Sequence, residues 1–266
     1  MSIMTTFTWN PKDYEMHSSA QQIWAKELFA KLNLQGHESI LDIGCGNGKI
    51  TAELSSLVPN GVVVGIDSSD TMIRFATDKY PPERFLNLRF IWADARQLRF
   101  QNQFDIVFSN AALHWVDDHL SVLKGISQSL KTKGRVLLQM GGRGNIPEML
   151  QAIEIVTSSM RWQTYFQHFS FPYHFYGLEE YQRWLEVVNL YPVRIELIPK
   201  TITYRSSEEL AGWIRTTWLP YTQQVPQQWR EDFIDELVAC YLRLCPAQNG
   251  SIQVQVMRLE VDAWKA

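Results

Sequence analysis

Two kinds of segment alternate along the first half of the chain. Mostly apolar runs, typical of strands buried in a parallel sheet, occupy residues 40–43, 62–67, 88–95, 104–108 and 135–140. Between them, apolar residues recur at helical spacing, as in the series Leu120, Leu123, Ile126 and Leu130. Strands that alternate with helices predict a parallel sheet with helices on both faces.

The second half has a different pattern, rich in aromatic residues from residue 146 onward. Further strand-like runs lie at 193–198 and 252–261, and amphipathic helices are predicted over Ser207–Arg215 and Trp229–Leu244. With 45% hydrophobic residues in 266, the chain can bury a full core. We expect one compact unit, in which residues 1–145 form a cofactor-binding core with an N-terminal lid helix. Residues 146–266 then supply a helical cap and the last two strands of the same sheet.

The N-terminal segment is predicted to be irregular up to residue 17. Ser18 or Ser19 can then cap a helix that carries Ile23, Trp24, Leu28 and Leu32 at helical spacing. We expect this leader to lie across the mouth of a ligand site, with Tyr14, His17 and Gln21 as candidate contacts. The alternative is a plain N-terminal helix that packs on the sheet.

The turn after the first strand carries the strongest chemical signal. Residues 42–48 read Asp-Ile-Gly-Cys-Gly-Asn-Gly, so glycines alternate between a strand and a helix. Such glycines permit positive φ angles and leave the backbone bare, which lets a ligand lie against the turn and the helix N-terminus. A dinucleotide fingerprint would need Gly at 49, and a P-loop would need Gly at 43 and Ser or Thr at 50. The chain has Lys49, Ile43 and Ile50 instead, and Asp42 suits a ligand with a positive charge.

The second strand also ends in an acid, Asp67. It lies 19 residues after Gly48 (67 − 48), near the ~20-residue spacing at which an acid accepts hydrogen bonds from ribose hydroxyls. The alternative is a surface acid that caps the next helix, a role open to Ser69 or Asp70. Turn and acid together predict an adenosine ligand that is cationic and lacks phosphate. S-adenosylmethionine has these properties.

These residues resemble the first motifs of class I S-adenosylmethionine-dependent methyltransferases. The resemblance implies a doubly wound, seven-stranded, mostly parallel Rossmann-like sheet, an antiparallel last strand and a helical substrate cap. It also implies that Asp94, at the end of the third strand, accepts from the adenine amino group while the Ala95 N–H donates to a ring nitrogen. The expected cofactor contacts are Tyr14, His17, Gln21, Asp42, Gly44, Cys45, Gly46, Asp67, Ser68, Met72, Asp94, Ala95 and Asn110.

A closer resemblance, to the trans-aconitate methyltransferase family, covers nearly the whole chain. It is carried by residues 9–14, 65–69, 109–119, 139–140, 213–216, 219–220 and 248–250. It implies methylation of a carboxylate of a small polycarboxylic acid. The chain departs from the family at His114, where Gln is usual, at residues 141–144, and at Trp218, which replaces a smaller residue. The reaction type therefore transfers better than the substrate.

The turn after the fourth strand should face the acceptor, because ligands bind outside the carboxyl ends of strands in open α/β sheets. Asn110-Ala111-Ala112 lacks the Pro-Pro-aromatic sequence usual in enzymes that methylate base amino groups. A carboxylate acceptor needs no general base, whereas a phenol, amine or carbon acceptor does. His114 is the candidate catalytic residue, as a base or an orienting group; packing is its alternative.

Arginine is the planar two-pronged donor that suits carboxylates, so Arg143 and Arg215 are candidate acceptor contacts. Each could instead be a solvated surface residue, as could Arg161 and Arg205. The expected acceptor contacts are His114, Trp115, Arg143, Tyr176 and Arg215.

Charge and cysteine content narrow the setting. Twenty-five basic and 28 acidic residues give a net charge of −3 without a basic block, which argues against nucleic acid as a partner. Three cysteines without metal-ligand spacing indicate reduced thiols and no metal site. No apolar run approaches the ~20 residues that span a bilayer. We expect a cytoplasmic enzyme with a small-molecule substrate. The alternatives are N- or C-methylation of an apolar or aromatic natural product, and a non-catalytic S-adenosylmethionine-binding protein.

Overall fold

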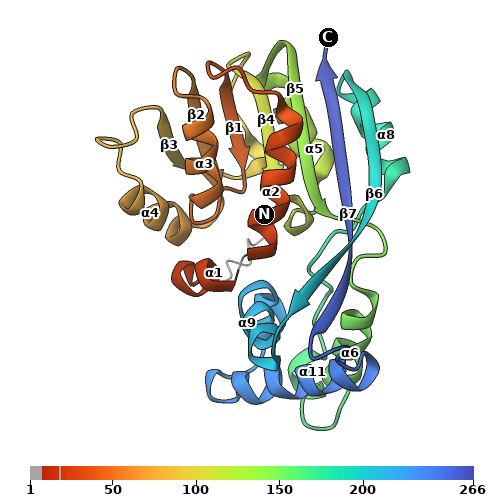
Figure 1. Cartoon of the computed structure of the whole chain (residues 1–266). Helices are drawn as coiled ribbons and strands as arrows, with labels where there is room; N and C mark the ends of the chain where they lie inside the picture. The colour runs from red at the N-terminus through yellow and green to blue at the C-terminus, as the bar shows by residue number, and fades with distance from the viewer. Residues whose placement is uncertain (1–7, 18) are drawn as a thin grey trace. The chain divides into compact units, whose positions relative to one another are not determined.

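The computed structural model describes residues 8–17 and 19–266 (Figure 1). These residues form two compact units. The core unit comprises Ser19–Arg143, Tyr173–Ile198 and Arg258–Ala266. The second unit comprises α1 (Pro11–His17), Gly144–Pro172 and Pro199–Met257. Within the segment 146–266, residues 173–198 and 258–266 pack with the core, where the last two strands were expected to complete the sheet.

A seven-stranded sheet has the order β3-β2-β1-β4-β5-β7-β6. The first five strands are parallel, and β7 pairs antiparallel with β5. This confirms the predicted doubly wound fold and its antiparallel last strand. The strands are β1 (Ser39–Ile43), β2 (Val62–Asp67), β3 (Leu88–Trp92), β4 (Phe104–Asn110), β5 (Leu130–Gly141), β6 (Leu190–Tyr204) and β7 (Ile252–Lys265).

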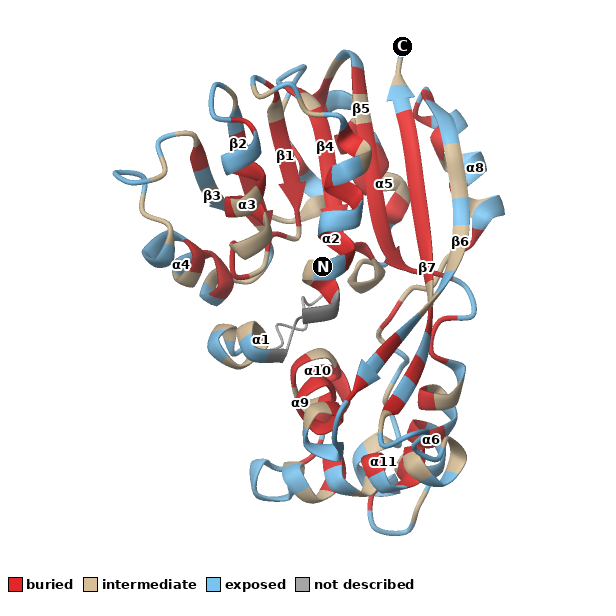
Figure 2. Ribbon diagram, in the orientation of Figure 1, coloured by how far each residue is buried: buried red, intermediate tan, exposed pale blue. Residues whose placement is uncertain are grey.

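Helices cover both faces of this sheet. Leu28 of α2 (Ser19–Leu32) and Leu54 of α3 (Lys49–Leu57) pack with Phe108 of β4 in one apolar cluster. Leu123 of α5 (His119–Ser129) and Leu185 of α8 (Leu178–Val187) belong to the cluster on the other face. α4 (Asp70–Lys79) packs on β2 and β3. Figure 2 shows the central strands buried along most of their length, as their apolar sequences require.

The second unit is mainly helical. It contains α6 (Pro147–Thr157), α7 (Gln163–Phe166), α9 (Ser207–Thr217), α10 (Leu219–Thr222) and α11 (Arg230–Leu244). α11 packs on α6 and α9, and α1 packs on α9. The rings of Trp162 and Phe233 meet edge to face at 5.4 Å, with both side chains buried. These aromatics therefore form a core between helices, and α9 and α11 confirm the two helices predicted here.

One local prediction was wrong. Residues 11–17 are helical rather than irregular, because Asn10 Oδ1 accepts from the N–H groups of Lys12 and Asp13, and Pro11 occupies the first helical position. The helix predicted to carry Ile23, Trp24, Leu28 and Leu32 is confirmed as α2, in which Ile23 is 59% exposed while Trp24 and Leu28 form the buried side.

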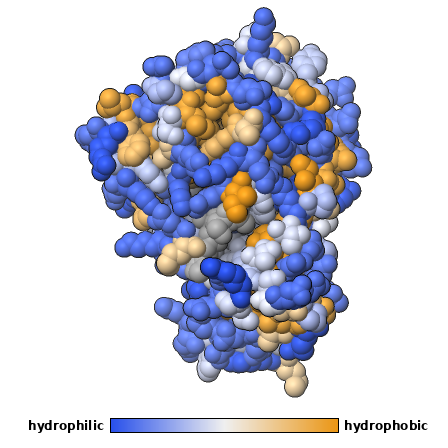
Figure 3. Space-filling model, viewed as in Figure 1, coloured by the Kyte–Doolittle hydropathy of each residue, from blue (hydrophilic) through white to orange (hydrophobic). Residues whose placement is uncertain are grey.

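The surface is mixed in polarity. In the view of Figure 3, hydrophobic residues lie in separate groups within a largely hydrophilic surface. Among the described residues, no helix combines the length and apolarity that a bilayer-spanning segment needs.

Candidate functional site

The glycine turn, residues 44–48, joins β1 to α3 at the carboxyl edge of the sheet. Gly44, Gly46 and Gly48 have φ angles of 78°, 53° and 77°. The N–H groups of Gly44 and Cys45 donate to the Ile66 carbonyl at 2.8 and 2.9 Å. The Gly46 N–H donates to Asp67 Oδ2 at 2.9 Å. The turn is thereby held against the end of β2, beside the point where the strand order reverses between β1 and β4.

The space beside two of these glycines is filled by the chain itself rather than left open for a ligand. A Cβ on Gly44 would lie 2.1 Å from the Ala112 Cβ, and one on Gly48 would lie 2.6 Å from the Phe90 ring. At Gly44 the missing side chain thus permits the turn after β4 to close on the glycine turn. The lack of a side chain, predicted to make room for a ligand, serves the packing of the chain itself at Gly44 and Gly48.

Two acids lie next to the glycine turn, Asp42 buried and Asp67 partly buried. Asp42 is 2% exposed and accepts from Thr51 Oγ1 at 2.7 Å. Burial, with the charge of Asp67 added, raises the pKa of Asp42 to about 7. Burial also raises the pKa of Asp67, although the N–H groups of Ser69 and Gly46 donate to its carboxylate. Such a pair favours a cation as its neighbour.

Several buried polar atoms around this edge have no hydrogen-bond partner within the described chain, and three of them lie on residues close to the glycine turn or to Asn110. They are Gln21 Oε1, Asn47 Nδ2 and Asn110 Oδ1. Asn110 Nδ2 donates to the backbone carbonyl of Gln21 at 2.8 Å, which ties the Asn110 side chain to α2. An unsatisfied buried group costs roughly 1–3 kcal/mol. Two amide oxygens and one amide N–H match the ammonium and the carboxylate of an amino-acid ligand, so these residues fit S-adenosylmethionine.

The alternative prediction, that Asp67 caps the next helix, does not hold, because a neighbouring residue fills that role. Ser69 caps α4, because its Oγ accepts from the Met72 N–H at 3.3 Å. Met72 itself is buried, whereas Ser68 is exposed. The thiol of Cys45 is buried, and burial together with Asp67 and Asp42 raises its pKa, so it stays protonated.

The end of β3 carries an ion pair that the sequence pattern did not predict. Asp94 caps the short helix Ala95–Gln97 by accepting from the Arg96 N–H at 2.9 Å. The Arg96 guanidinium donates to both Asp94 oxygens and, at 2.9 Å, to Asp117 Oδ1. Arg96 therefore ties the end of β3 to the segment after β4. An adenine contact of Asp94 and Ala95 stays a prediction.

Residues 111–118, here called the acceptor turn, follow β4. His119 fixes this turn because its Nε2–H donates to the Leu113 carbonyl at 2.8 Å, and its Nδ1 accepts from the Tyr181 hydroxyl at 2.7 Å. Burial lowers the pKa of His119 to about 4, so the ring is neutral at pH 7. The sequence did not predict that His119 holds the acceptor turn, because it stands at the start of an apolar helical pattern without a motif that marks it.

His114 lies on the acceptor turn against aromatic rings. Its ring centroid is 6.2 Å from those of Tyr173 and Phe175, and 5.9 Å from that of Trp115. The Gly141 N–H points to His114 Nδ1 at 3.5 Å. Burial first, and then the charge of Arg258, hold the pKa of His114 well below its usual value. The ring is therefore neutral, and with Nδ1 as acceptor it carries its proton on Nε2.

Two further predicted acceptor contacts adjoin this turn. The Arg143 N–H donates to the Tyr176 carbonyl at 2.9 Å, and the Tyr176 hydroxyl donates to the Asp117 carbonyl at 2.9 Å. The exposed Arg143 guanidinium pairs with Glu180. The core unit thus brings His114, Trp115, Arg143 and Tyr176 to one region.

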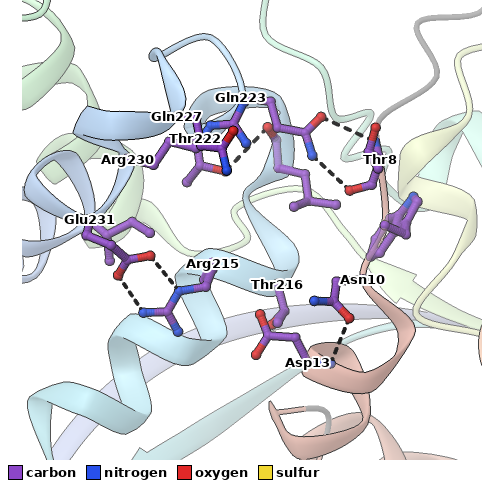
Figure 4. Close-up of a pocket in the computed structure, with 13 residues that line it drawn as sticks. Thr8, Asn10, Asp13, Arg215, Thr216, Thr222, Gln223, Gln227, Arg230 and Glu231 are labelled. Atoms are coloured by element: carbon purple, nitrogen blue, oxygen red, sulfur yellow. Dashed lines mark hydrogen bonds and ion pairs between the residues drawn. The ribbon is translucent and has the colours of Figure 1, made fainter.

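Arg215 and Tyr14 belong to the second unit. Arg215 lines a pocket of about 410 Å³ there, and its guanidinium donates to both Glu231 oxygens at 3.0 and 2.7 Å (Figure 4). Glu231 thus offsets its charge. Tyr14 packs edge to face on Trp9 at 5.8 Å. The side chain of His17 lies outside the described residues.

Comparisons with known proteins agree with this architecture. Residues 40–134 match the family model for a methyltransferase domain. An uncharacterised methyltransferase of Schizosaccharomyces pombe is 31% identical, over 97% of this chain and 98% of that protein. A trans-aconitate 2-methyltransferase of an Enterobacter species is 27% identical, over 94% and 96% of the two chains.

Solved structures show the same fold. The YcgJ protein from Bacillus subtilis has a TM-score of 0.61 and 20% identity, over 94% of this chain and 99% of that one. Its likeness supports the sheet topology. Together with similarity to methyltransferases along nearly the whole chain, the topology and the glycine turn show that this protein belongs to the class I methyltransferases, which use S-adenosylmethionine as methyl donor.

Proposed function

We propose that this enzyme transfers the methyl group of S-adenosylmethionine to a carboxylate oxygen of a small molecule. The observation that supports this most is the state of His114: a neutral ring with a lowered pKa, whose Nδ1 already accepts from Gly141. Such a ring is a poor general base but a good Nε2–H donor. It suits an acceptor that is already ionised at pH 7, as a carboxylate is. Similarity to trans-aconitate 2-methyltransferases supports the same chemistry.

In this proposal the residues of the core unit hold the donor and orient the acceptor. When bound, S-adenosylmethionine supplies a methyl group made electrophilic by its sulfonium. Asp67 would accept from the ribose, while Gln21, Asn47 and Asn110 would satisfy the amino-acid end. The acceptor turn would hold a carboxylate through the His114 Nε2–H. Positioning of this kind is worth up to ~7–11 kcal/mol in favourable models. The small acceptor, the cytoplasmic location and the absence of a nucleic-acid partner stay predictions.

A labelled-methyl assay tests the proposal. The enzyme would be incubated with labelled S-adenosylmethionine and a panel of small polycarboxylic acids, fatty acids, phenols and indoles. We expect label in base-labile methyl esters of the small acids. Label found only in phenols or indoles would contradict the proposal, and bound cofactor without turnover on any class would favour the non-catalytic alternative.

Asp42 should make cofactor affinity depend on pH. Its raised pKa of about 7 means that the ligand-free protein keeps much of this acid protonated at neutral pH, while a cationic ligand favours the carboxylate. Affinity should therefore rise with pH up to about 7, by at most about tenfold per unit, and level off above it. Calorimetry from pH 5.5 to 8.5 measures this affinity. The ligand's own titration affects wild type and Asp42→Asn alike, so the difference between the two proteins isolates the contribution of Asp42. Equal slopes in both proteins would contradict the role of Asp42.

Replacing His114 with glutamine should show whether this residue acts as a general base or as a hydrogen-bond donor that orients the acceptor. Because an amide N–H can replace the Nε2–H, we expect turnover of carboxylates to stay within about fivefold, whereas loss of a true general base costs about 10²–10⁴-fold. At saturating S-adenosylmethionine, the pH profile on carboxylates should be flat from pH 6.5 to 8.5, since His114 is already neutral there. A large loss on phenol acceptors alone would show that His114 is a base for protonated acceptors, and equal, large losses on carboxylate and phenol acceptors would contradict the orienting role.

One observation favours the second candidate, methylation of an apolar or aromatic molecule. Trp115, Tyr173 and Phe175 place aromatic rings beside His114, and Trp115 and Tyr173 meet at 4.8 Å. Such a wall suits a flat or apolar acceptor. A protonated acceptor of this kind would give turnover that rises steeply with pH, in contrast to the flat profile expected for a carboxylate.

A further inference from the structure

β7 carries a deeply buried arginine at the carboxyl edge of the sheet. Arg258 is 4% exposed, and no other lysine or arginine in the described part of the chain is as deeply buried. Because β7 runs antiparallel to β5, Arg258 pairs with Gly141, the last residue of β5. It therefore lies at the edge where the parallel strands end and ligands bind in such sheets.

Arg258 lies close to the same residues that adjoin the acceptor turn. Its guanidinium lies 4.7 Å from the ring centre of Trp24 on α2, the helix whose Gln21 carbonyl accepts from Asn110. Its strand neighbour Gly141 donates to His114 Nδ1. A fixed cation and the Nε2–H of a neutral imidazole thus belong to one small region.

Two acids on this face of β7 have structural partners. Glu260 and Asp262 alternate with buried apolar residues as Arg258 does. Glu260 accepts from Lys31 at 2.6 Å and pairs with Arg194. Asp262 accepts from Arg135 through both oxygens. The two acids of β7 are thus held by the chain's own cations, whereas Arg258 places a positive charge at the ligand edge.

We propose that Arg258 is an acceptor-binding residue that receives an anionic carboxylate of the acceptor. A guanidinium is planar and presents paired N–H donors that match a carboxylate, and a low-exposure setting strengthens such a contact. With the His114 Nε2–H it would form a donor pair that selects acids over neutral molecules. This inference rests on the proposed function, and it adds the residue that makes the site selective for anions. The predicted candidates Arg143 and Arg215 are more exposed than Arg258.

Direct binding measurements test this assignment separately from catalysis. Trans-aconitate would be titrated by calorimetry into the enzyme saturated with S-adenosylhomocysteine. We expect Arg258→Met to weaken its binding by roughly 30-fold or more, as loss of one partner of a buried charge pair does, while affinity for S-adenosylhomocysteine stays within about twofold. Arg89→Met, a change at an exposed arginine on β3, is the control and should alter neither affinity.

The outcomes distinguish this inference from the proposed function. Anion binding that depends on Arg258, without methyl transfer to any carboxylate, would leave the inference standing and overturn the function. Equal anion affinity in wild type and Arg258→Met, or no anion binding to wild type, would overturn the inference whatever the turnover. If Arg258→Met no longer binds S-adenosylhomocysteine, Arg258→Gln is judged by the same numbers. Loss of that affinity in both variants would mark Arg258 as structural and overturn the assignment.

Discussion

Gly44→Ala is expected to lower the free energy of unfolding by about 2–5 kcal/mol and to weaken S-adenosylhomocysteine binding at least 100-fold. The new Cβ would lie 2.1 Å from the Ala112 Cβ, at a φ of 78° that L-residues rarely adopt. Positive φ in a non-glycine residue costs about 1–2 kcal/mol, and overpacking adds about 1–3 kcal/mol. Urea denaturation and calorimetry measure the two effects.

A matched control separates backbone strain from the clash. Gly144 has a similar φ of 80°, but nothing lies within 4 Å of its Cβ position. Gly144→Ala should therefore lose only about 1–2 kcal/mol and keep cofactor affinity. Adding Ala112→Gly to Gly44→Ala removes the clashing methyl group and should restore part of the loss. Equal losses in the two single variants, with no rescue, would show that the contact with Ala112 does not matter.

Asp67→Ala is expected to weaken S-adenosylmethionine binding by about 10²–10⁴-fold. Two charge-assisted hydrogen bonds to ribose hydroxyls are worth roughly 1.5–3 kcal/mol each. The same change removes the acceptor of the Gly46 N–H, so the glycine turn also loses one of its hydrogen bonds to β2, while those from Gly44 and Cys45 to the Ile66 carbonyl remain. Calorimetry with wild type and variant measures the affinity.

Asp70→Ala is the control for Asp67, because Asp70 lies three residues later and pairs with Arg74 on the surface of α4 at 2.8 Å. An exposed pair contributes little, so cofactor affinity should change less than about twofold. If Asp67→Ala kept affinity within about threefold of wild type, the ribose assignment would be wrong.

The pattern of the sequence was sufficient for the fold. Buried parallel strands require unbroken apolar runs, so β1, β2 and β4 were visible as strands from residue types alone. The exposed Trp92 and Ile91 on the edge strand β3 were not predictable, because periodicity does not say which strand has a single neighbour. Nor did it show that the part of the segment 173–198 that precedes the predicted strand packs with the core.

The site was predictable where function depends on local spacing. Asp42, the glycines and Asp67 lie on consecutive elements, so sequence distance predicts their meeting. Arg258 lies near His114 only because the antiparallel register of β7 with β5 pairs it with Gly141. In the sequence, Arg258, Glu260 and Asp262 alternate with apolar residues of one strand. This alternation indicates buried charged residues, but it does not indicate which of the three faces a ligand. Arg96 was missed because its two partners lie on separate elements.

The approach of Gly44 to Ala112 also limits how new acceptor preferences could be engineered. Because that contact leaves no room for an added side chain, a mutant library that randomises position 112 would mostly contain inactive proteins. Diversity is better placed at Trp115, Tyr173 and Phe175, whose rings lie beside His114 and make no such contact with the glycine turn. Directed evolution of this scaffold should therefore reshape the aromatic wall and keep alanine or glycine at 112.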